Sequence, residues 1–396
     1  MKRFDITYFF GPESEYIVKP EVLADIKAAG FTFIPLNTST EIHKGVLPML
    51  KELGLGATVQ DSHISEIYYK KDFSAVEDTV KTVVEDYAAY GYLLGFEIVD
   101  EPSAADFPML AALVKAFRRY APDKETVINL FPNYANAGQL GTPDYETHVD
   151  RFIREVDPHF ISYDHYHFIG RESAELKKEG IDEREFAIRQ AAESEDRAGF
   201  FENIESIRAI AKRYGLDTMM IVLLVEHGPY RNLTRAELLW EVNMCLAYGM
   251  RRLSYFTYWT PPYDDYWRYT NAMCDREGNK MPHYDDVQTI NRHLYPVGQG
   301  LFEREWQAAF HVGRAEPGGT LFKGYGDVSA IEGPFGVVGF YDDGSFYLVN
   351  GDYRNAATFR IVSDAPLARY EKDAFIPCPS VLTLGAGEGV WIRKQG

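Results

Sequence analysis

The sequence predicts an α/β fold: a (β/α)₈ TIM barrel over residues 1–300, followed by a small C-terminal all-β, sandwich-like domain over residues 301–396. Eight short β-like runs alternate with helical patterns, at about 32 residues per unit, which is typical of such a barrel. A doubly wound open sheet would carry a glycine-rich phosphate loop after its first strand, and residues 10–13 (FGPE) do not form one. Beyond residue 300 the pattern changes to alternating strands separated by turn signals.

The eight expected strands are short apolar runs rich in β-branched and aromatic residues, bounded by turn residues. They lie at residues 5–10, 31–36, 55–60, 93–99, 126–131, 160–166, 218–225 and 252–258. Amphipathic patterns between them predict helices, of which the clearest lie at residues 20–29, 74–90, 104–120, 144–156, 200–214 and 234–249. Their starts carry capping signals. These are Pro20 in a first turn, Ser74 and Ser103 as N-caps, and Thr234 with Glu237 in capping-box spacing.

One unit is longer than the others. Residues 169–199, between the sixth strand and its helix, form a stretch rich in acidic and basic side chains. This stretch predicts either an inserted solvated helix or, equally, a cleft wall or an oligomer contact, so a homo-oligomer is a possible assembly. After a last helix near residues 282–295, the C-terminal strands are expected at 337–341, 345–350, 357–362 and 389–393.

Composition excludes several classes of protein. Hydrophobic residues make up 46% of the chain and charged residues 25%, which is typical of a folded soluble protein with a large core. The 41 basic and 59 acidic residues leave a net charge of −18. Such a surface repels phosphate backbones and anionic lipid, so we expect neither a nucleic-acid nor a membrane partner.

Cysteine usage and the N-terminal residues predict a cytoplasmic protein. Three cysteines, Cys245, Cys274 and Cys378, are too few and too scattered for a disulfide framework or a zinc cluster. The first residues offer no apolar signal stretch, and no run of 18 apolar residues is present.

Two carboxylates follow strands that face each other across the predicted barrel. The fourth strand ends in residues 96–102 (FEIVDEP), which contain Glu101, and the seventh ends in residues 225–228 (VEHG), which contain Glu226. The active site of a parallel barrel lies at the C-terminal ends of its strands. Glycosidic cleavage needs such a pair, one acid to protonate the leaving oxygen and one carboxylate to attack the anomeric carbon.

Residues 95–102 (GFEIVDEP) resemble the strand-four signature of clan A glycoside hydrolases, in which an aromatic residue, an interior Glu and apolar residues precede Asn-Glu-Pro. The resemblance implies a retaining glycosidase that hydrolyses β-glycosidic bonds of oligosaccharides without a metal or cofactor. It places the acid/base at Glu101, the nucleophile at Glu226 and the tryptophan that floors the sugar subsite at Trp259. Members commonly have a non-proline cis peptide after this tryptophan. We therefore expect one at Trp259–Thr260, with the indole face open to the cleft.

Asp100 departs from the signature, where an Asn donates a hydrogen bond to the sugar 2-hydroxyl. An ionised Asp can bind that hydroxyl only by accepting its proton. Its charge beside Glu101 should raise the pKa of that acid, which suits a general acid. Glu97 shares the parity of Glu101 but lies deeper, and we expect it to be a structural charge paired with an Arg.

Other side chains at the strand ends are candidate sugar ligands. In the family a Tyr or His from the sixth strand hydrogen-bonds the nucleophile, and Tyr166 or His167 could do so here. After the third strand, His63 could reach the sugar. After the second and fifth strands, Asn37, Asn133 and Tyr134 are expected to bind hydroxyl groups. The loop 260–267 is aromatic and acidic, which suits sugar stacking or equally packing against the β-domain.

Two other functions are compatible with the sequence. One is a metal-dependent barrel hydrolase that uses Asp61, His63, His165 and His167; it is disfavoured because the first strand has no His-x-His and the fourth no metal-bridging lysine. The other is a non-catalytic sugar-binding barrel, suggested by Asp100. The sequence does not select the sugar, the linkage, or exo over endo attack.

Overall fold

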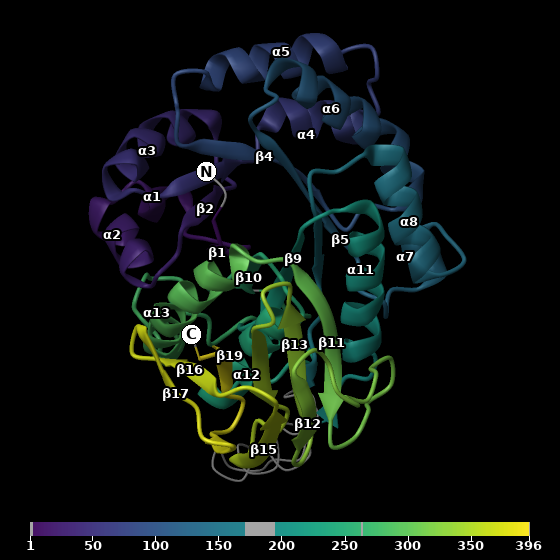
Figure 1. Ribbon diagram of the computed structural model, residues 1–396. Helices are drawn as coiled ribbons and strands as arrows, with labels where there is room; N and C mark the ends of the chain where they lie inside the picture. Colours follow the sequence, from purple (N-terminus) through teal and green to yellow (C-terminus); the bar gives the residue numbers. More distant parts are fainter. Residues whose placement is uncertain (1–2, 171–194, 263, 396) are drawn as a thin grey trace.

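The computed structural model describes residues 3–170, 195–262 and 264–395, and these form the expected barrel with interleaved helices (Figure 1). All eight predicted strands are present and parallel, in the sheet order β1-β10-β9-β6-β5-β4-β3-β2. They are β1 (Asp5–Tyr8), β2 (Phe33–Leu36), β3 (Gly56–Val59), β4 (Leu93–Asp100), β5 (Glu125–Leu130), β6 (Ile161–Asp164), β9 (Thr218–Leu223) and β10 (Arg252–Phe256).

Threonine side chains help to close the barrel between β1 and β2. The Thr32 amide donates to the Ile6 carbonyl at 2.8 Å, and the Thr32 hydroxyl accepts from the Ile6 amide at 3.0 Å. The Thr7 hydroxyl donates to the Phe33 carbonyl at 2.9 Å. These bonds occupy backbone groups that would otherwise be buried without partners.

The predicted helices surround the strands, together with four further helices, α1, α3, α4 and α7. Helix α3 packs against β3, and α4 packs against β4. The helices are α1 (Ser14–Ile17), α2 (Pro20–Ala28), α3 (Thr40–Leu53), α4 (Ser62–Lys70), α5 (Val76–Tyr87), η1 (Ala104–Asp106), α6 (Phe107–Tyr120), α7 (Ala137–Leu140), α8 (Tyr145–Val156), α11 (Phe200–Tyr214), α12 (Arg235–Ala247) and α13 (Pro282–Phe302). No helix of the described ranges is long and apolar enough to cross a membrane.

The capping predictions are confirmed at three helices and wrong at one. Pro20 is the first residue of α2. Thr234 and Glu237 form the capping box of α12, and Ser103 accepts from an amide of η1. Ser74 does not cap α5, which begins after Ala75 without a side-chain cap. The Ser74 hydroxyl instead donates to Asp72 at 2.6 Å, within the turn that precedes the helix. The Ser74 hydroxyl is therefore used in a local bond to Asp72 and does not cap α5.

The ends of the long charged stretch lie side by side. Strand β7 (Phe168–Ile169) pairs antiparallel with β8 (Glu195–Asp196). Residues 171–194, which carry most of that stretch, lie outside the described residues. The predictions about their role therefore stay predictions.

The C-terminal region forms two antiparallel sheets, as predicted. A six-stranded sheet has the order β11-β13-β14-β19-β16-β17, and a three-stranded sheet the order β12-β15-β18. Buried apolar side chains from both sheets form one cluster between them. The strands are β11 (Trp306–Val312), β12 (Val328–Glu332), β13 (Gly336–Tyr341), β14 (Phe346–Asn350), β15 (Ala357–Ser363), β16 (Leu367–Glu371), β17 (Ala374–Pro377), β18 (Val381–Leu384) and β19 (Gly389–Lys394).

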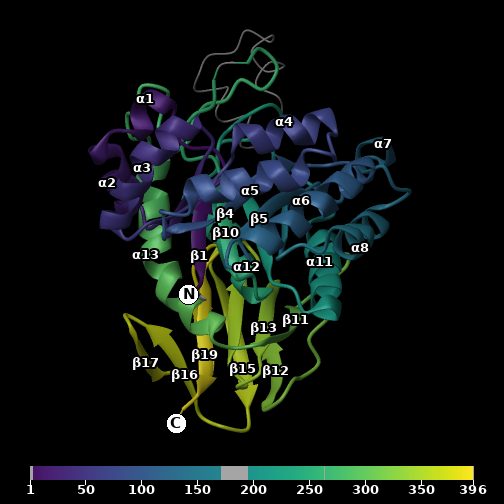
Figure 2. The same cartoon turned by 90° about the horizontal axis from the view of Figure 1, so that it is seen from above.

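These sheets lie against the side of the barrel that α11, α12 and α13 cover (Figure 1, Figure 2). The contact with α12 is close, because a side chain on Gly339 would lie 1.7 Å from the Ala247 carbonyl oxygen. Buried polar bonds join the layers as well. The Tyr347 hydroxyl donates to Asn243 at 2.7 Å, and the Tyr341 hydroxyl to the Leu246 carbonyl at 2.6 Å. All of these contacts are made with α12, on the flank of the barrel.

Candidate active site

A β-bulge in β4 determines which carboxylates face the barrel interior. The pairing with β5 shifts between Glu97 and Val99, so that Glu97 lies opposite Val127 and Asp100 opposite Asn129. One extra residue reverses the alternation of side chains along a strand. Glu97 and Asp100 consequently both line the interior cavity. Glu97 therefore lies inside the barrel, as expected, and the bulge brings Asp100 to the same cavity.

Glu101 occupies the turn that follows the bulge. Its backbone lies in the left-handed region, with φ of 48°, and its amide donates to the Asn129 carbonyl at 2.8 Å. Such a conformation is costly for a residue with a side chain, and it occurs mainly at functional sites. Burial, with a further contribution from Asp100, raises the pKa of Glu101 to about 7. The carboxyl therefore keeps its proton to a higher pH than an ordinary glutamic acid does.

Glu226 also follows a bulge. The amides of Leu224 and Val225 both donate to the Phe256 carbonyl, at 2.8 and 2.9 Å. The next residue, Glu226, leaves the barrel and pairs its backbone with Thr270 through two 3.0 Å bonds. The Asn271 amide donates to Glu226 Oε2 at 2.7 Å. Two bulges thus re-aim the chain just before the two carboxylates that the sequence singled out.

Asn129 joins two carboxyl groups at the mouth of the barrel. Its amide nitrogen donates to Asp100 at 3.0 Å and to Asp164 at 2.9 Å, while its oxygen accepts from the Ser162 hydroxyl at 2.8 Å. Asp164 is 4% exposed, and burial, Glu101 and Asp100 raise its pKa well above the usual value. Sequence reasoning missed Asn129 and Asp164, although both lie at the C-terminal ends of β5 and β6, where site residues were sought.

Of the two candidates from β6, Tyr166 lies with this carboxylate cluster. Burial, followed by the charge of Asp164, raises its pKa well above the usual value. The Tyr166 ring stacks on Phe256 at 5.3 Å, and its amide donates to the Tyr134 hydroxyl at 3.5 Å.

His167 lies elsewhere. Its ring stacks on Trp240 at 5.0 Å, and its Nδ1 is 3.0 Å from the Arg197 carbonyl oxygen. Burial lowers the pKa of His167 to about 4, so the ring is neutral. This side chain therefore packs toward α12, and the contact with the nucleophile that the sequence allowed for it is wrong.

Trp259 is not a sugar platform in this structure. Its side chain is 1% exposed, and its ring lies 4.8 Å from that of Tyr16. The non-proline cis peptide lies at Phe256–Thr257 rather than at Trp259–Thr260. Both expectations for Trp259 are therefore wrong.

Trp267 provides an accessible aromatic side chain near Glu226. It is 36% exposed, and its carbonyl accepts from the Gly228 amide at 2.7 Å. Gly228 has φ of 48°, and a side chain there would lie 2.9 Å from the indole. The His227 ring lies 5.7 Å from the indole and stacks on Tyr269 at 5.1 Å. The described part of the loop 260–267 thus packs at the end of β9 rather than against the C-terminal sheets.

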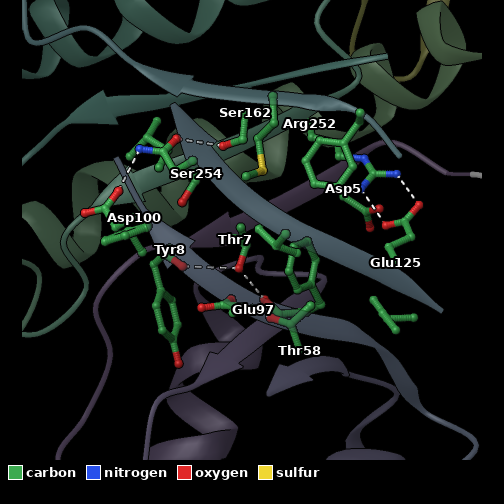
Figure 3. A pocket seen from close by; sticks show the side chains of 18 of the residues that line it. Asp5, Thr7, Tyr8, Thr58, Glu97, Asp100, Glu125, Ser162, Arg252 and Ser254 are labelled. Atoms are coloured by element: carbon green, nitrogen blue, oxygen red, sulfur yellow. Dashed lines mark hydrogen bonds and ion pairs between the residues drawn. The ribbon is translucent and has the colours of Figure 1, made fainter. Parts of the chain in front are cut away.

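A cavity of about 230 Å³, lined by both polar and apolar side chains, lies inside the barrel below these carboxyl groups (Figure 3). Arg252 forms its floor with Glu125, through two bonds of 2.6 Å. Glu97 accepts from the Thr58 hydroxyl at 2.7 Å, and burial raises its pKa to about 7. The expectation that Glu97 pairs with an Arg is wrong, because Arg252 pairs with Glu125 instead. Polar residues that line the cavity are Asp5, Thr7, Asn37, Thr58, Gln60, Glu97, Asp100, Glu125, Asn129, Ser162, Arg252 and Ser254.

The remaining candidates occupy different surroundings. Asn37 lines both the cavity and a second pocket beside β2 and α1. His63 has a side chain 63% exposed in the first turn of α4, with Nδ1 2.9 Å from Asp61 Oδ1. Asn133 donates to the Gly199 carbonyl at 2.9 Å, which fixes the start of α11.

The residues of the metal-dependent alternative do not come together. No group of three or more His, Cys, Asp or Glu side chains in the described ranges is placed to hold a metal ion. His165 is fully buried with both ring nitrogens unpaired in this part of the chain, and its ring lies 5.2 Å from Tyr134. The four-residue metal set predicted as an alternative is therefore wrong.

Comparison with known proteins gives a fold but no sequence family: no family model and no curated protein matches the chain. A solved glycoside hydrolase aligns at TM-score 0.60 and 10% identity, over 98% of this chain and 92% of that one. A β-galactosidase from Rahnella sp. aligns at TM-score 0.54 and 12% identity, over 78% of this chain and 58% of that one. A third, the β-galactosidase from Marinomonas ef1, aligns at TM-score 0.51 and 9% identity, over 76% and 62%.

The chain spans between 58% and 62% of the length of the β-galactosidases it resembles. At these identities the likeness establishes the fold alone. The structure is similar to those of the glycoside hydrolase and β-galactosidases named above, with a parallel eight-stranded barrel.

Proposed function

We propose that the chain is a retaining glycoside hydrolase that cleaves β-glycosidic bonds of oligosaccharides, with Glu101 as acid/base and Glu226 as nucleophile. The proposal rests chiefly on Glu101. This carboxyl lies in a strained turn at the end of β4, and burial together with Asp100 raises its pKa to about 7. A general acid that works near neutral pH needs such a pKa.

In the first step, Glu101 donates its proton to the departing glycosidic oxygen while Glu226 attacks the anomeric carbon. The bond from the anomeric carbon to the leaving oxygen breaks, and an ester to the Glu226 carboxylate forms. Asn271 donates to Glu226 Oε2 and so helps to hold the attacking carboxylate in place. In a retaining enzyme the two carboxyl groups should lie roughly 5–5.5 Å apart.

In the second step, the ionised Glu101 accepts a proton from water, which attacks the anomeric carbon and releases Glu226. The same residue thus acts as acid and then as base. A pKa near 7 supports both directions of proton transfer at neutral pH.

Sugar hydroxyl groups would be held by the polar side chains around the mouth. Asp100 accepts a hydrogen bond from Asn129 and borders the cavity, so its carboxylate has room to accept one from a hydroxyl group. Asn37 borders the same cavity, and Tyr134 lies next to Tyr166. Exposed Trp267 would stack on an apolar sugar face.

A mechanism-based label tests this assignment. The protein is assayed with a panel of aryl β-glycosides, and the anomer of the first product is followed by NMR. The 2-deoxy-2-fluoro analogue of the best substrate should then inactivate the enzyme and label the peptide that contains Glu226. A label on another carboxylate would reassign the nucleophile. Binding of sugars without turnover of any glycoside would instead favour a non-catalytic sugar-binding barrel.

A further inference from the structure

A second large hollow lies at the other end of the barrel. This crevice of about 1100 Å³ lies where the barrel strands begin, and residues 304–307 and Tyr341 of the C-terminal region line it as well. Ligand sites are common where two parts of a chain meet. The Arg252–Glu125 ion pair lines both the crevice and the interior cavity, so it forms the partition between them. The crevice is therefore separate from the proposed catalytic mouth.

The crevice is more basic than the rest of the molecule. Seven Lys or Arg residues line it against five Asp or Glu residues, whereas the whole chain carries a net charge of −18. Most of these cations have acidic partners in the described ranges. The pairs are Arg3–Asp5, Lys124–Asp123, Arg251–Asp217, Arg252–Glu125 and Arg304–Asp343.

Arg208 differs from these cations. It extends from α11, is 8% exposed, and has no carboxylate within ion-pair distance among the described residues. Its Nη1 donates to the Thr218 hydroxyl at 2.9 Å, whereas its Nε is buried without a partner. Burial, aided by Arg251 and opposed only in part by two tyrosines and Asp217, lowers the pKa of Arg208 to about 10. The guanidinium therefore remains charged in a place that disfavours charge.

Trp306 holds two of the cations together. The Arg208 guanidinium lies 4.5 Å and the Lys212 ammonium 5.8 Å from the centre of its ring. The indole is fixed, because its nitrogen donates to the Ala247 carbonyl at 2.9 Å and its ring packs against Gly249. A cation–π contact and one hydroxyl bond offset only part of the cost of burying an unpaired guanidinium. A counter-charge is missing from this corner of the crevice.

We propose that this crevice binds a small molecule bearing a phosphate or carboxylate group, with Arg208 as the principal ligand and Lys212 and Arg251 as neighbouring cations. A planar guanidinium fits two oxygens of either oxyanion. The bound anion supplies the charge that Arg208 lacks and relieves its repulsion with Arg251. The anion site does not depend on the proposed hydrolase activity, because the binding of an anion is measured directly and not through turnover of a glycoside.

Calorimetric titration of the full chain tests this proposal, with inorganic phosphate and citrate as probes and glucose as the neutral control. The variants are Arg208→Met, which keeps the aliphatic stem, and Arg208→Lys, which keeps the charge but loses the bidentate donor set. Arg213→Met is the matched control, because Arg213 lies on the same helix but is exposed and paired with Asp150.

We expect saturable binding of at least one anion to the wild type, and none of glucose. The affinity should fall by about tenfold or more in Arg208→Met, fall less in Arg208→Lys, and stay unchanged in Arg213→Met. Preference for phosphate or for citrate identifies which oxyanion the crevice selects. Should Arg208→Met fail to fold, Arg208→Lys and an Arg251→Gln variant carry the comparison. Absence of heat with both anions up to about 10 mM, or equal affinity in the Arg208 variants, overturns the proposal.

Discussion

Asn129 donates a hydrogen bond of 3.0 Å to Asp100, the residue that stands where the clan A signature has Asn. The bond fixes Asp100 next to Glu101, and the same amide also holds Asp164. Asp100 thus accepts from the protein with one oxygen and raises the pKa of Glu101 with its charge. A substitution at the signature position is accommodated by an amide from the neighbouring strand.

The first prediction concerns the pH dependence of turnover. Burial is the larger cause of the raised pKa of Glu101, and the charge of Asp100 is the second. Asp100→Asn removes that charge, so the pKa of Glu101 should fall, while burial keeps it above its usual value. The acid must be protonated for glycosylation, so the alkaline limb of kcat/KM should move to lower pH. A pH–rate profile on an aryl glycoside measures the shift, with Asp285→Asn, an exposed residue of α13, as control. An alkaline limb that stays in place would contradict the electrostatic role of Asp100.

The second prediction separates the roles of the two carboxylates. Glu226→Ala should abolish turnover of every glycoside, whereas Glu101→Ala should still be glycosylated by substrates whose aryl leaving group needs little protonation. With a disaccharide, Glu101→Ala should lose roughly 10²–10⁴-fold in rate, as expected for general acid–base catalysis.

Added azide distinguishes the variants, because it needs no general base. It should give the β-glycosyl azide with Glu101→Ala and the α-glycosyl azide with Glu226→Ala, as identified by NMR. Exchanged products would mean that the two roles are reversed. Full activity in either variant would contradict the mechanism.

The third prediction tests Trp267 as the sugar platform. Trp267→Ala should raise KM by about fivefold while kcat changes little, because ring stacking contributes about 1 kcal/mol to sugar binding. Tyr69→Ala is the control, since Tyr69 is also an exposed aromatic residue, 71% accessible, but lies on α4. Unchanged steady-state kinetics in Trp267→Ala would remove this side chain from the site.

The fourth prediction concerns a buried acid outside the site. Glu241 on α12 is 0% exposed, neither of its oxygens has a hydrogen bond of normal geometry in the described part of the chain, and burial raises its pKa well above the usual value. Because the folded-state pKa exceeds that of the unfolded chain, the stability it contributes is present at low pH and is lost as the pH rises.

Glu241→Gln should therefore raise Tm relative to the wild type, and by more at about pH 8 than at about pH 5. Between the unfolded-state and folded-state pKa values of Glu241, the free energy of unfolding of the wild type falls by at most about 1.4 kcal/mol per pH unit. Thermal unfolding at both pH values measures the difference, with Glu146→Gln, at an exposed position of α8, as control. A gain in Tm that is the same at both pH values would mean that the carboxyl is not held neutral.

The site could be predicted only in part. Glu101 and Glu226 were singled out because each follows a buried strand directly, a signal that local sequence carries. The partners that position them were not found: Asn129 acts from the next strand, and Asn271 reaches Glu226 from 45 residues further along the chain. The error at Trp259 has the same origin, because a short-range pattern cannot tell an indole that faces a cleft from one that packs on Tyr16.

The sequence by itself determined the number and order of the barrel strands and the presence of C-terminal sheets, because alternation, helical periodicity and turn residues are local properties. The tertiary structure decided which side chains share the barrel mouth. Bulges before Asp100 and Glu226 reverse the alternation of side chains along their strands. Each bulge depends on how its strand pairs with a neighbour, β5 or β10, and not on the bulged residues alone. Only folding could also leave Arg208 buried without an acidic partner, because its surroundings come from α11, β9 and β11 together.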